Sequence, residues 1–134
     1  MLRFYSIISG SSGNSALLTD GKTNILIDCG TSGKRTIEAL ESLSVPASRI
    51  NAIVVSHEHI DHTKGVGILS RKFDIPIYAT SGTHNKSEFG KIDDSLIHEV
   101  SPDITYDIRG IGITPFSIPH DAAEPCGFIL TDGH

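Results

Sequence analysis

Three of the chain's seven histidines fall within one short stretch, Ser56-His57-Glu58-His59-Ile60-Asp61-His62 (SHEHIDH). The residues directly before it, 52–55 (AIVV), form an apolar run that is typical of a buried strand. In an extended segment, alternate residues point the same way, so the imidazoles of His57 and His59 can converge on one ion. A cluster placed directly after a buried strand is not the pattern of a polar surface loop with chance histidines.

The remaining ligand-type side chains of this stretch indicate a second group. Asp61 continues the alternation, and His62 lies where the chain turns into the next predicted helix. We therefore expect His57 and His59 to bind one ion, and Asp61 and His62 to bind another. Imidazole and carboxylate ligands suit zinc, manganese or iron. Each ion still lacks ligands, and His120, in a loop after a predicted strand, is the best remaining candidate.

Composition bounds the class of protein. A chain of 134 residues suits one domain with a sizeable core. The formal charge of −5 and the pI near 5.7 indicate no broad basic surface, so any contact with nucleic acid must be local. No stretch approaches the length of a membrane span, and we expect a soluble, cytoplasmic protein. Cys29 and Cys126, far apart and without a secretory signal, are expected to be buried thiols, not a disulfide.

Short strands and helices interleave along the chain. The predicted strands cover residues 3–8, 15–19, 24–28, 52–55, 76–79, 104–107, 111–116 and 127–131. Asp20-Gly21 and Arg109-Gly110 are hairpin turn signals. A helix is expected to open at Ser32 or Gly33, and a second one to cover 63–71 with Asp61 or Thr63 as a possible cap. Residues 80–95 are ambiguous.

This pattern predicts an α/β (α+β) fold, with a mixed sheet that carries helices on one outer face. Near the end of the chain, Asp132-Gly133 is a turn signal with only one residue after it. A hairpin thus begins there without its second strand. We therefore expect residues 1–134 to form a single domain that is incomplete at its C-terminus.

The spacing His-x-His-x-Asp-His after an apolar strand resembles the metallo-β-lactamase superfamily. Residues 25–30 (ILIDCG) resemble the family's first hairpin, and residues 117–125 resemble the segment that carries the third ligand of the first metal. Other stretches are similar to the WalJ/YycJ-type subfamily of bacterial metallohydrolases. They are residues 8–15 (ISGSSGNS), 65–67 (GVG), 75–80 (IPIYAT) and 120–125 (HDAAEP).

The resemblance implies an αββα metallohydrolase sandwich with two divalent ions, zinc or manganese. By this resemblance His57, His59 and His120 hold metal one. Asp61, which is also the candidate catalytic residue, holds metal two together with His62. Asp28 is implied to orient the histidine loop from behind the ligands. The family also uses a bridging Asp and a final His further along, which no residue here matches, so only the first part of the fold is expected.

Hydrolysis is the predicted reaction, because two ions about 3.5–4 Å apart can activate a water and stabilise the attacking and leaving oxygens. A phosphodiester, a thioester and a lactam would all qualify as substrates. Members near the subfamily are described as DNA-processing enzymes, including 5′-to-3′ exonucleases, so the resemblance favours DNA. The alternatives are a thioester hydrolase of the glyoxalase II sort and a metal-binding fragment without catalysis.

Weaker signals surround this cluster. Ser11, Ser12 and Asn14, in the loop of residues 9–14 (SGSSGN), could contact a substrate phosphate. Lys34 is a further candidate for that role, although a solvated charge at a helix end is the simpler interpretation. Glu58 alternates away from its histidine neighbours and is expected to face a polar partner outside the metal site. A truncated chain would leave the strand at 127–131 as an exposed edge, so self-association is expected.

Overall fold

The computed structural model describes residues 1–9, 13–119 and 121–132. A six-stranded sheet has the order β1-β2-β3-β4-β5-β6, with β1 (Arg3–Ile8), β2 (Ser15–Thr19), β3 (Asn24–Ile27), β4 (Ala52–Val54), β5 (Ile77–Ala79) and β6 (Ile97–Glu99). Its first three strands are antiparallel, and the neighbours from β3 onward are parallel. A second, antiparallel sheet contains β7 (Tyr106–Ile108), β8 (Ile111–Ser117) and β9 (Cys126–Asp132).

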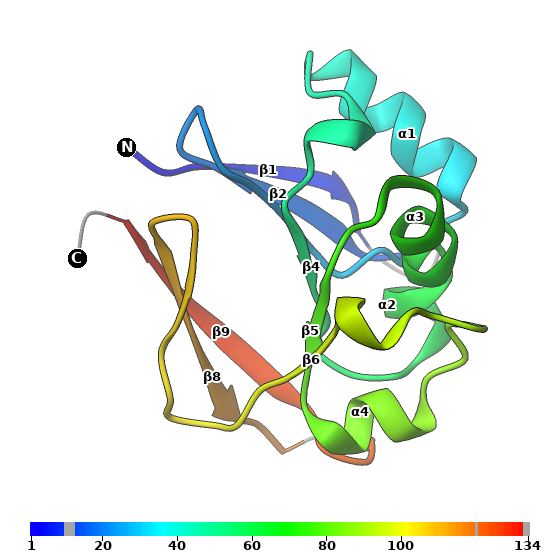
Figure 1. Ribbon diagram of the computed structural model, residues 1–134, viewed down its shortest axis with the longest axis vertical. Coiled ribbons are helices and arrows are strands. Elements are labelled where there is room, and N and C mark those ends of the chain that lie inside the picture. The colour runs from blue at the N-terminus through cyan, green and yellow to red at the C-terminus, as the bar shows by residue number, and fades with distance from the viewer. Residues whose placement is uncertain (10–12, 120, 133–134) are drawn as a thin grey trace.

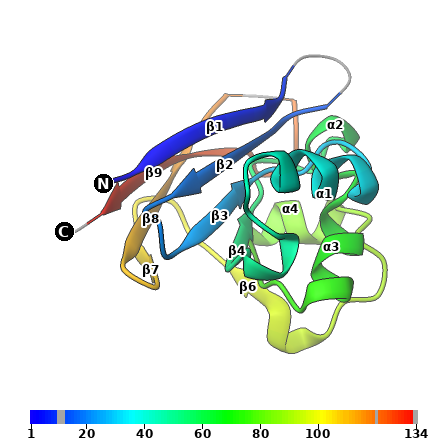
Figure 2. The same cartoon turned by 90° about the horizontal axis from the view of Figure 1, so that it is seen from above.

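The helices cover one face of the six-stranded sheet, and the three-stranded sheet lies against the other (Figures 1 and 2). The helices are α1 (Gly33–Ser42), α2 (Ile60–Thr63), α3 (Val66–Phe73) and α4 (Ser81–Lys86), with short 3₁₀ turns η1 (Ala47–Arg49) and η2 (Asp94–Leu96). The expected mixed sheet with helices on one outer face is therefore confirmed. A second sheet completes the layers, as the resemblance to an αββα sandwich implies. Within the described ranges, no helix is long and apolar enough to cross a membrane.

Two apolar clusters fill the spaces between the layers. Leu26 and Ile53 point toward the helices, where they pack with Leu40 and other buried residues. Ile25 and Val54 point the other way, into a cluster shared with the three-stranded sheet. Because layers cover both faces of β4, its sequence is apolar throughout instead of alternating.

The predicted helix over 63–71 is wrong in its bounds and in its cap. The chain forms α2 and α3 in its place, separated at Lys64 and Gly65, and His59 occupies the cap position of α2. Gly65 lies so close to the segment before α1 that a Cβ there would stand 2.5 Å from the carbonyl oxygen of Thr31. The N–H of Gly65 donates to the carbonyl of Cys29 at 2.9 Å, a long-range contact that interrupts the helix and leaves no pattern in the local sequence.

The other local predictions fare better. Ser32 caps α1 by accepting the N–H of Arg35 at 3.2 Å, as expected for a serine at this position. The ambiguous region 80–95 holds α4 and the start of η2. Cys29 and Cys126 are free and buried, as expected. Burial raises the pKa of the Cys29 thiol to about 11 and that of Cys126 to about 12, so both are neutral at physiological pH.

Candidate metal centre

The histidine loop, residues 56–62, leaves the carboxyl end of β4 and leads into α2. His57 is buried, whereas His59 and Asp61 are half-buried. One ligand atom from each of these three side chains lies within 4.8 Å of the other two. The ring of His62 packs against that of His57, with the two centroids 4.0 Å apart. Among the described residues, this is the only group of three or more such side chains that could hold a metal ion.

The structure thus brings together the four predicted ligands of the histidine loop, but not as two separate pairs. Asp61 groups with His57 and His59, and it also lies near His62, whose Nε2 is 3.7 Å from the Asp61 Oδ2. The carboxylate of Asp61 therefore lies close both to the pair His57 and His59 and to His62. Position 120, the predicted third ligand of metal one, lies outside the described residues.

Asp28 anchors the loop from the neighbouring strand. It follows β3 directly, and β3 is the parallel neighbour of β4. Its backbone adopts a left-handed conformation (φ 58°), which Asp tolerates better than most residues. Its carboxylate accepts the N–H of Ser56 on Oδ1 at 2.7 Å and the hydroxyl of Ser56 on Oδ2 at 2.7 Å.

The same carboxylate orients His62. Its Oδ2 lies 2.7 Å from Nδ1 of His62, and because an ionised carboxylate only accepts, Nδ1 carries the proton. The Nε2 atom then remains as the lone-pair side of the ring, facing Asp61 and the Nδ2 of Asn14 at 3.3 Å. Burial opposes the charge on the His62 imidazole, but the hydrogen bond and charge of Asp28, with the charge of Asp61, outweigh it and raise its pKa above the ordinary value.

Backbone contacts fix the loop further. Asn14 donates its N–H to the carbonyl of Asp61 at 2.7 Å, and Cys29 donates its N–H to the carbonyl of His62 at 2.9 Å. Gly30 lies directly against this crossing, where a Cβ would stand 1.7 Å from the Asp61 carbonyl oxygen. Three chain segments far apart in sequence therefore interlock around the candidate metal centre.

The remaining predicted residues divide into four groups. Asn14 is part of the site, because its Nδ2 also donates to Oδ2 of Asp61 at 3.3 Å. Lys34 is exposed on α1, and no hydrogen bond or ion pair in the described ranges joins it to the histidine loop. Ser11 and Ser12 lie outside the described residues. Glu58 points away from the ligands, as expected, and its Oε2 accepts the N–H of Ala123 at 2.9 Å.

Sequence reasoning missed the role of Ser56. Its hydroxyl donates to Asp28 and lies 2.9 Å from the Nδ1 of His57, so it links the carboxylate to a predicted ligand. A serine directly before the first histidine of the cluster was the available signal, but its partner is 28 positions away in the chain.

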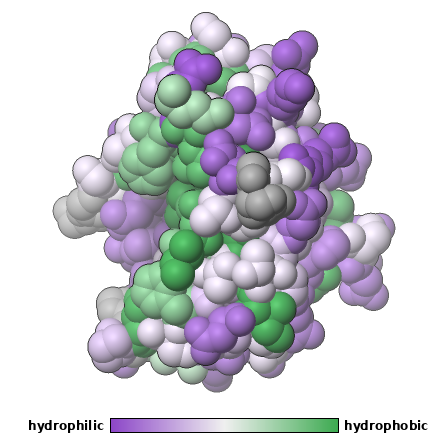
Figure 3. Space-filling model, turned by 90° about the vertical axis from the view of Figure 1, so that its left-hand side faces the viewer, coloured by the Kyte–Doolittle hydropathy of each residue, from purple (hydrophilic) through white to green (hydrophobic). Residues whose placement is uncertain are grey.

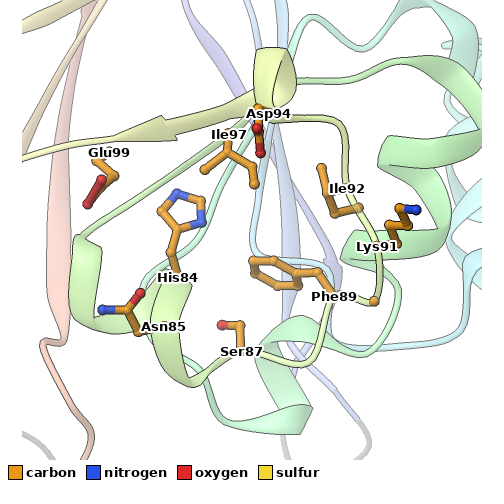
Figure 4. A pocket seen from close by; sticks show the side chains of 10 residues that line it. His84, Asn85, Ser87, Phe89, Lys91, Ile92, Asp94, Ile97 and Glu99 are labelled. Atoms are coloured by element: carbon orange, nitrogen blue, oxygen red, sulfur yellow. The ribbon is translucent and has the colours of Figure 1, made fainter.

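A separate cleft, with a volume of about 500 Å³, lies between α4, the segment after it and β6 (Figure 4). His84, Phe89 and Glu99 are among its lining side chains, and no residue of the histidine loop is. The Nε2 of His84 is engaged with the carbonyl oxygen of His98 at 2.9 Å. The candidate chemistry therefore belongs to the histidine loop and not to this cleft.

With this geometry in place, the comparison with known families is decisive. The family model described as the metallo-beta-lactamase superfamily matches residues 8–133. The chain belongs to this superfamily. Exodeoxyribonuclease WalJ of Streptococcus pneumoniae serotype 2 is 39% identical over 126 residues, which are 90% of this chain and 47% of that protein. Exodeoxyribonuclease YycJ of Bacillus anthracis is 38% identical over 128 residues, 92% of this chain and 48% of that protein.

Solved structures agree on the fold. A B3 metallo-β-lactamase with an active-site glutamic acid has a TM-score of 0.81 and 15% identity, over 98% of this chain and 55% of that one. Rm3 metallo-beta-lactamase has a TM-score of 0.77 and 19% identity, over 97% of this chain and 55% of that one. The chain therefore spans about half the length of the relatives and structures that it matches.

Proposed function

We propose that this chain carries the metal centre of a dinuclear metal-dependent hydrolase that cleaves phosphodiester bonds of DNA, in the manner of a 5′-to-3′ exonuclease. The observation that carries the proposal is the convergence of His57, His59 and Asp61 within 4.8 Å. Its support for DNA is the 39% identity to a relative named an exodeoxyribonuclease.

The side chains present fit a divalent ion. Two imidazoles and a carboxylate form a donor set that suits zinc or manganese, and their spacing allows one ion to touch all three. In the proposed arrangement His57, His59 and His120 hold the first ion, and Asp61 and His62 hold the second. Bound in this way, the pair would lower the pKa of a water and stabilise the attacking and leaving oxygens of the phosphate.

The chain's own residues prepare this chemistry by fixing orientation and proton position. Asp28 holds the proton of His62 on Nδ1, so that Nε2 offers its lone pair toward the centre. Asn14 donates to Oδ2 of Asp61 at 3.3 Å, which leaves the other carboxylate oxygen, Oδ1, to bind an ion. We assign Asp61 the catalytic role because its carboxylate lies between the two groups of histidines.

Substrate contacts are proposed on the same side of the molecule. Asn14 already reaches the centre, and Ser11 and Ser12 precede it in the same loop. The formal charge of −5 does not provide a net positive surface. Hydroxyl and amide donors of this kind can bind phosphate oxygens without one. Lys34, exposed in the first turn of α1, is proposed as a contact for a phosphate further along the strand.

This chain on its own is expected to bind about one divalent ion and to hydrolyse DNA weakly. Metal one has three proposed ligands, whereas metal two has only Asp61 and His62. Three protein ligands form a catalytic-type zinc site, and two make a weaker one. A metal-binding chain without catalysis is therefore the second candidate, and it is favoured by the two proposed ligands for metal two among the described residues.

The test combines metal analysis with two hydrolysis assays. Metal content is measured after dialysis against zinc or manganese. End-labelled duplex DNA and an acyl-glutathione are then incubated with the chain, with its His57→Ala variant as background and the pneumococcal WalJ protein as a reference. One bound ion and nucleotide release above the variant's background would support the proposal.

Each of the other outcomes would contradict part of the proposed function. One bound ion without nucleotide release would establish the non-catalytic alternative for this chain. Thioester turnover without nucleotide release would replace DNA with a thioester as the substrate. No bound metal would overturn the metal centre itself.

A further inference from the structure

The segment of residues 121–126 leads into β9 from the connection between β8 and β9 of the three-stranded sheet, and the histidine loop holds one side of it. The N–H of Ala123 donates to Oε2 of Glu58 at 2.9 Å. The N–H of Cys126 donates to the carbonyl oxygen of Ser56 at 2.9 Å. Residues on both sides of position 124 are therefore bonded to the loop that carries the ligands.

The start of α4 holds the other side, through a single residue. The backbone carbonyl of Glu124 accepts the hydroxyl of Thr80 at 2.8 Å and that of Thr83 at 3.3 Å. Its side-chain Oε1 accepts the N–H of Gly82 at 2.9 Å and the hydroxyl of Ser81 at 3.3 Å. Glu124 is thus fixed at both its backbone and its carboxylate.

Packing supports this double attachment. The side chains of Thr80 and Thr83 are fully buried, and the carbonyl of Glu124 accepts from them beside the 3.0 Å contact between the two hydroxyls. A Cβ on Gly82 would stand 2.6 Å from the Cβ of Glu124, so the helix start leaves room for this side chain only because position 82 is glycine. These contacts leave the segment little freedom relative to α4.

Glu58 points to a role beyond stability. Its Oε1 is buried, and the described residues provide no hydrogen-bond partner for it. Burying a carboxylate oxygen without a partner costs free energy, because no hydrogen bond offsets its lost contact with water. The position of Glu58, between two predicted ligands and the 121–126 segment, suggests what offsets it.

We propose that Glu58 and Glu124 are positioning residues of the metal centre, which clasp the 121–126 segment between the histidine loop and the start of α4. The inference rests on the proposed function, because this segment begins directly after His120 in the sequence. Nothing beyond that adjacency is used for position 120. The clasp would set where the chain enters and leaves the site, and so would determine the affinity for the first ion.

The decisive experiment titrates the 134-residue chain with cobalt(II), whose visible absorption reports the number and arrangement of its ligands. The variants are Glu124→Ala, Glu124→Gln and Gly82→Ala, with Glu38→Ala, an exposed carboxylate on α1, as the matched control. Gln keeps an oxygen that can accept the N–H of Gly82, so Glu124→Gln should retain cobalt binding. Gly82→Ala should displace Glu124 without altering its charge.

We expect Glu124→Ala and Gly82→Ala to weaken cobalt binding by about 10-fold or more, with an altered spectrum, in line with the effect of residues that support metal ligands. Glu124→Gln and the control should match the unmodified chain. Thermal unfolding of each metal-free variant is measured alongside, because a purely structural role would lower the melting temperature without changing the spectrum of the bound cobalt.

The results separate this inference from the proposed function. If the unmodified chain binds no cobalt, the metal centre is wrong. If it binds cobalt and Glu124→Ala binds it equally well with the same spectrum, only the clasp is wrong. A Glu124→Ala chain that fails to fold transfers the decision to Glu58→Ala, which removes the acceptor of the Ala123 N–H. An unchanged spectrum and affinity in a folded Glu58→Ala protein would also overturn the proposal.

Discussion

Two regions of the molecule differ sharply in how well they are held. At the metal centre, residues 13–14, 28–30 and 56–62 are crosslinked by backbone and carboxylate hydrogen bonds. In the three-stranded sheet, β9 is an edge strand, and Ile129 remains 54% exposed. Figure 3 shows apolar residues gathered on the side of the molecule where β1 and β9 lie in Figure 1. Hydrogen bonds thus hold the fold together at the proposed metal centre, whereas the edge strand β9 leaves apolar side chains exposed.

The largest expected effect comes from Gly30→Ala, which attacks the crosslinked region directly. A Cβ would stand 1.7 Å from the carbonyl oxygen of Asp61, and the backbone on both sides is hydrogen-bonded, so neither can move freely. Overpacking costs about 1–3 kcal/mol and sometimes more. Chemical denaturation should show at least this loss. Gly33→Ala is the control, because Gly33 also lacks a positive φ and its Cβ would meet only the exposed side chain of Ile68. Equal stability of the two variants would contradict the crosslinked frame.

His57→Ala or His59→Ala should abolish metal binding while the fold survives. Neither residue belongs to the two apolar clusters, so their loss opens no cavity in the hydrophobic core, although His57 is buried. Circular dichroism and metal content measure the two effects separately. His98→Ala, on the exposed strand β6, should change neither. Normal metal occupancy in either loop variant would remove that histidine from the ligand set.

Asp28→Asn should have a smaller effect, about 10–100-fold in metal affinity, because it changes the support of a ligand and not the ligand itself. The amide oxygen can still accept the N–H of Ser56. The amide nitrogen, however, would face the Nδ1 proton of His62, and two donors cannot pair. Calorimetric titration with zinc measures the shift. Complete loss of binding would mean that Asp28 is itself a ligand, and unchanged binding would mean that it has no role.

The smallest effect should come from the other flank. We propose that the chain self-associates through β9, because an edge strand with exposed apolar side chains recruits other chains. Ile129→Lys places a charge on this edge without touching the metal centre. Light scattering should show less association, with metal affinity unchanged. A chain that is already monomeric at high concentration would remove the proposal, whatever the variant does.

The sequence predicts most of this fold because its strands are short, apolar and bounded by clear turns. The parallel strands β3 and β4 and the ligands that follow β4 are visible as runs and alternation over a few residues. The contacts that complete the site leave no such pattern. Ser56 and Asp28 are 28 positions apart, and Glu58 and Ala123 are 65 apart, so only the folded chain brings them together.

The broken helix near Gly65 has the same origin. Local propensity favours one helix there, but the N–H of Gly65 donates to the carbonyl of Cys29 instead of to a carbonyl four residues back. Tertiary contact overrides propensity in such cases. The same limit applies to the three-stranded sheet, whose separation from the first sheet could not be derived from strand patterns alone.

The parallel register of β3 and β4 has a consequence for how this protein can vary. Ile27 pairs with Val54, so Asp28 and Ser56 meet because each lies just beyond its strand's end. The crossover between the strands, residues 29–51, could gain or lose residues in its outer turns without moving that meeting point. One residue inserted between Ile27 and Asp28, in contrast, would turn the carboxylate to the opposite face of the sheet. Tolerance to insertion should therefore change from broad to nil within a few positions of the strand end.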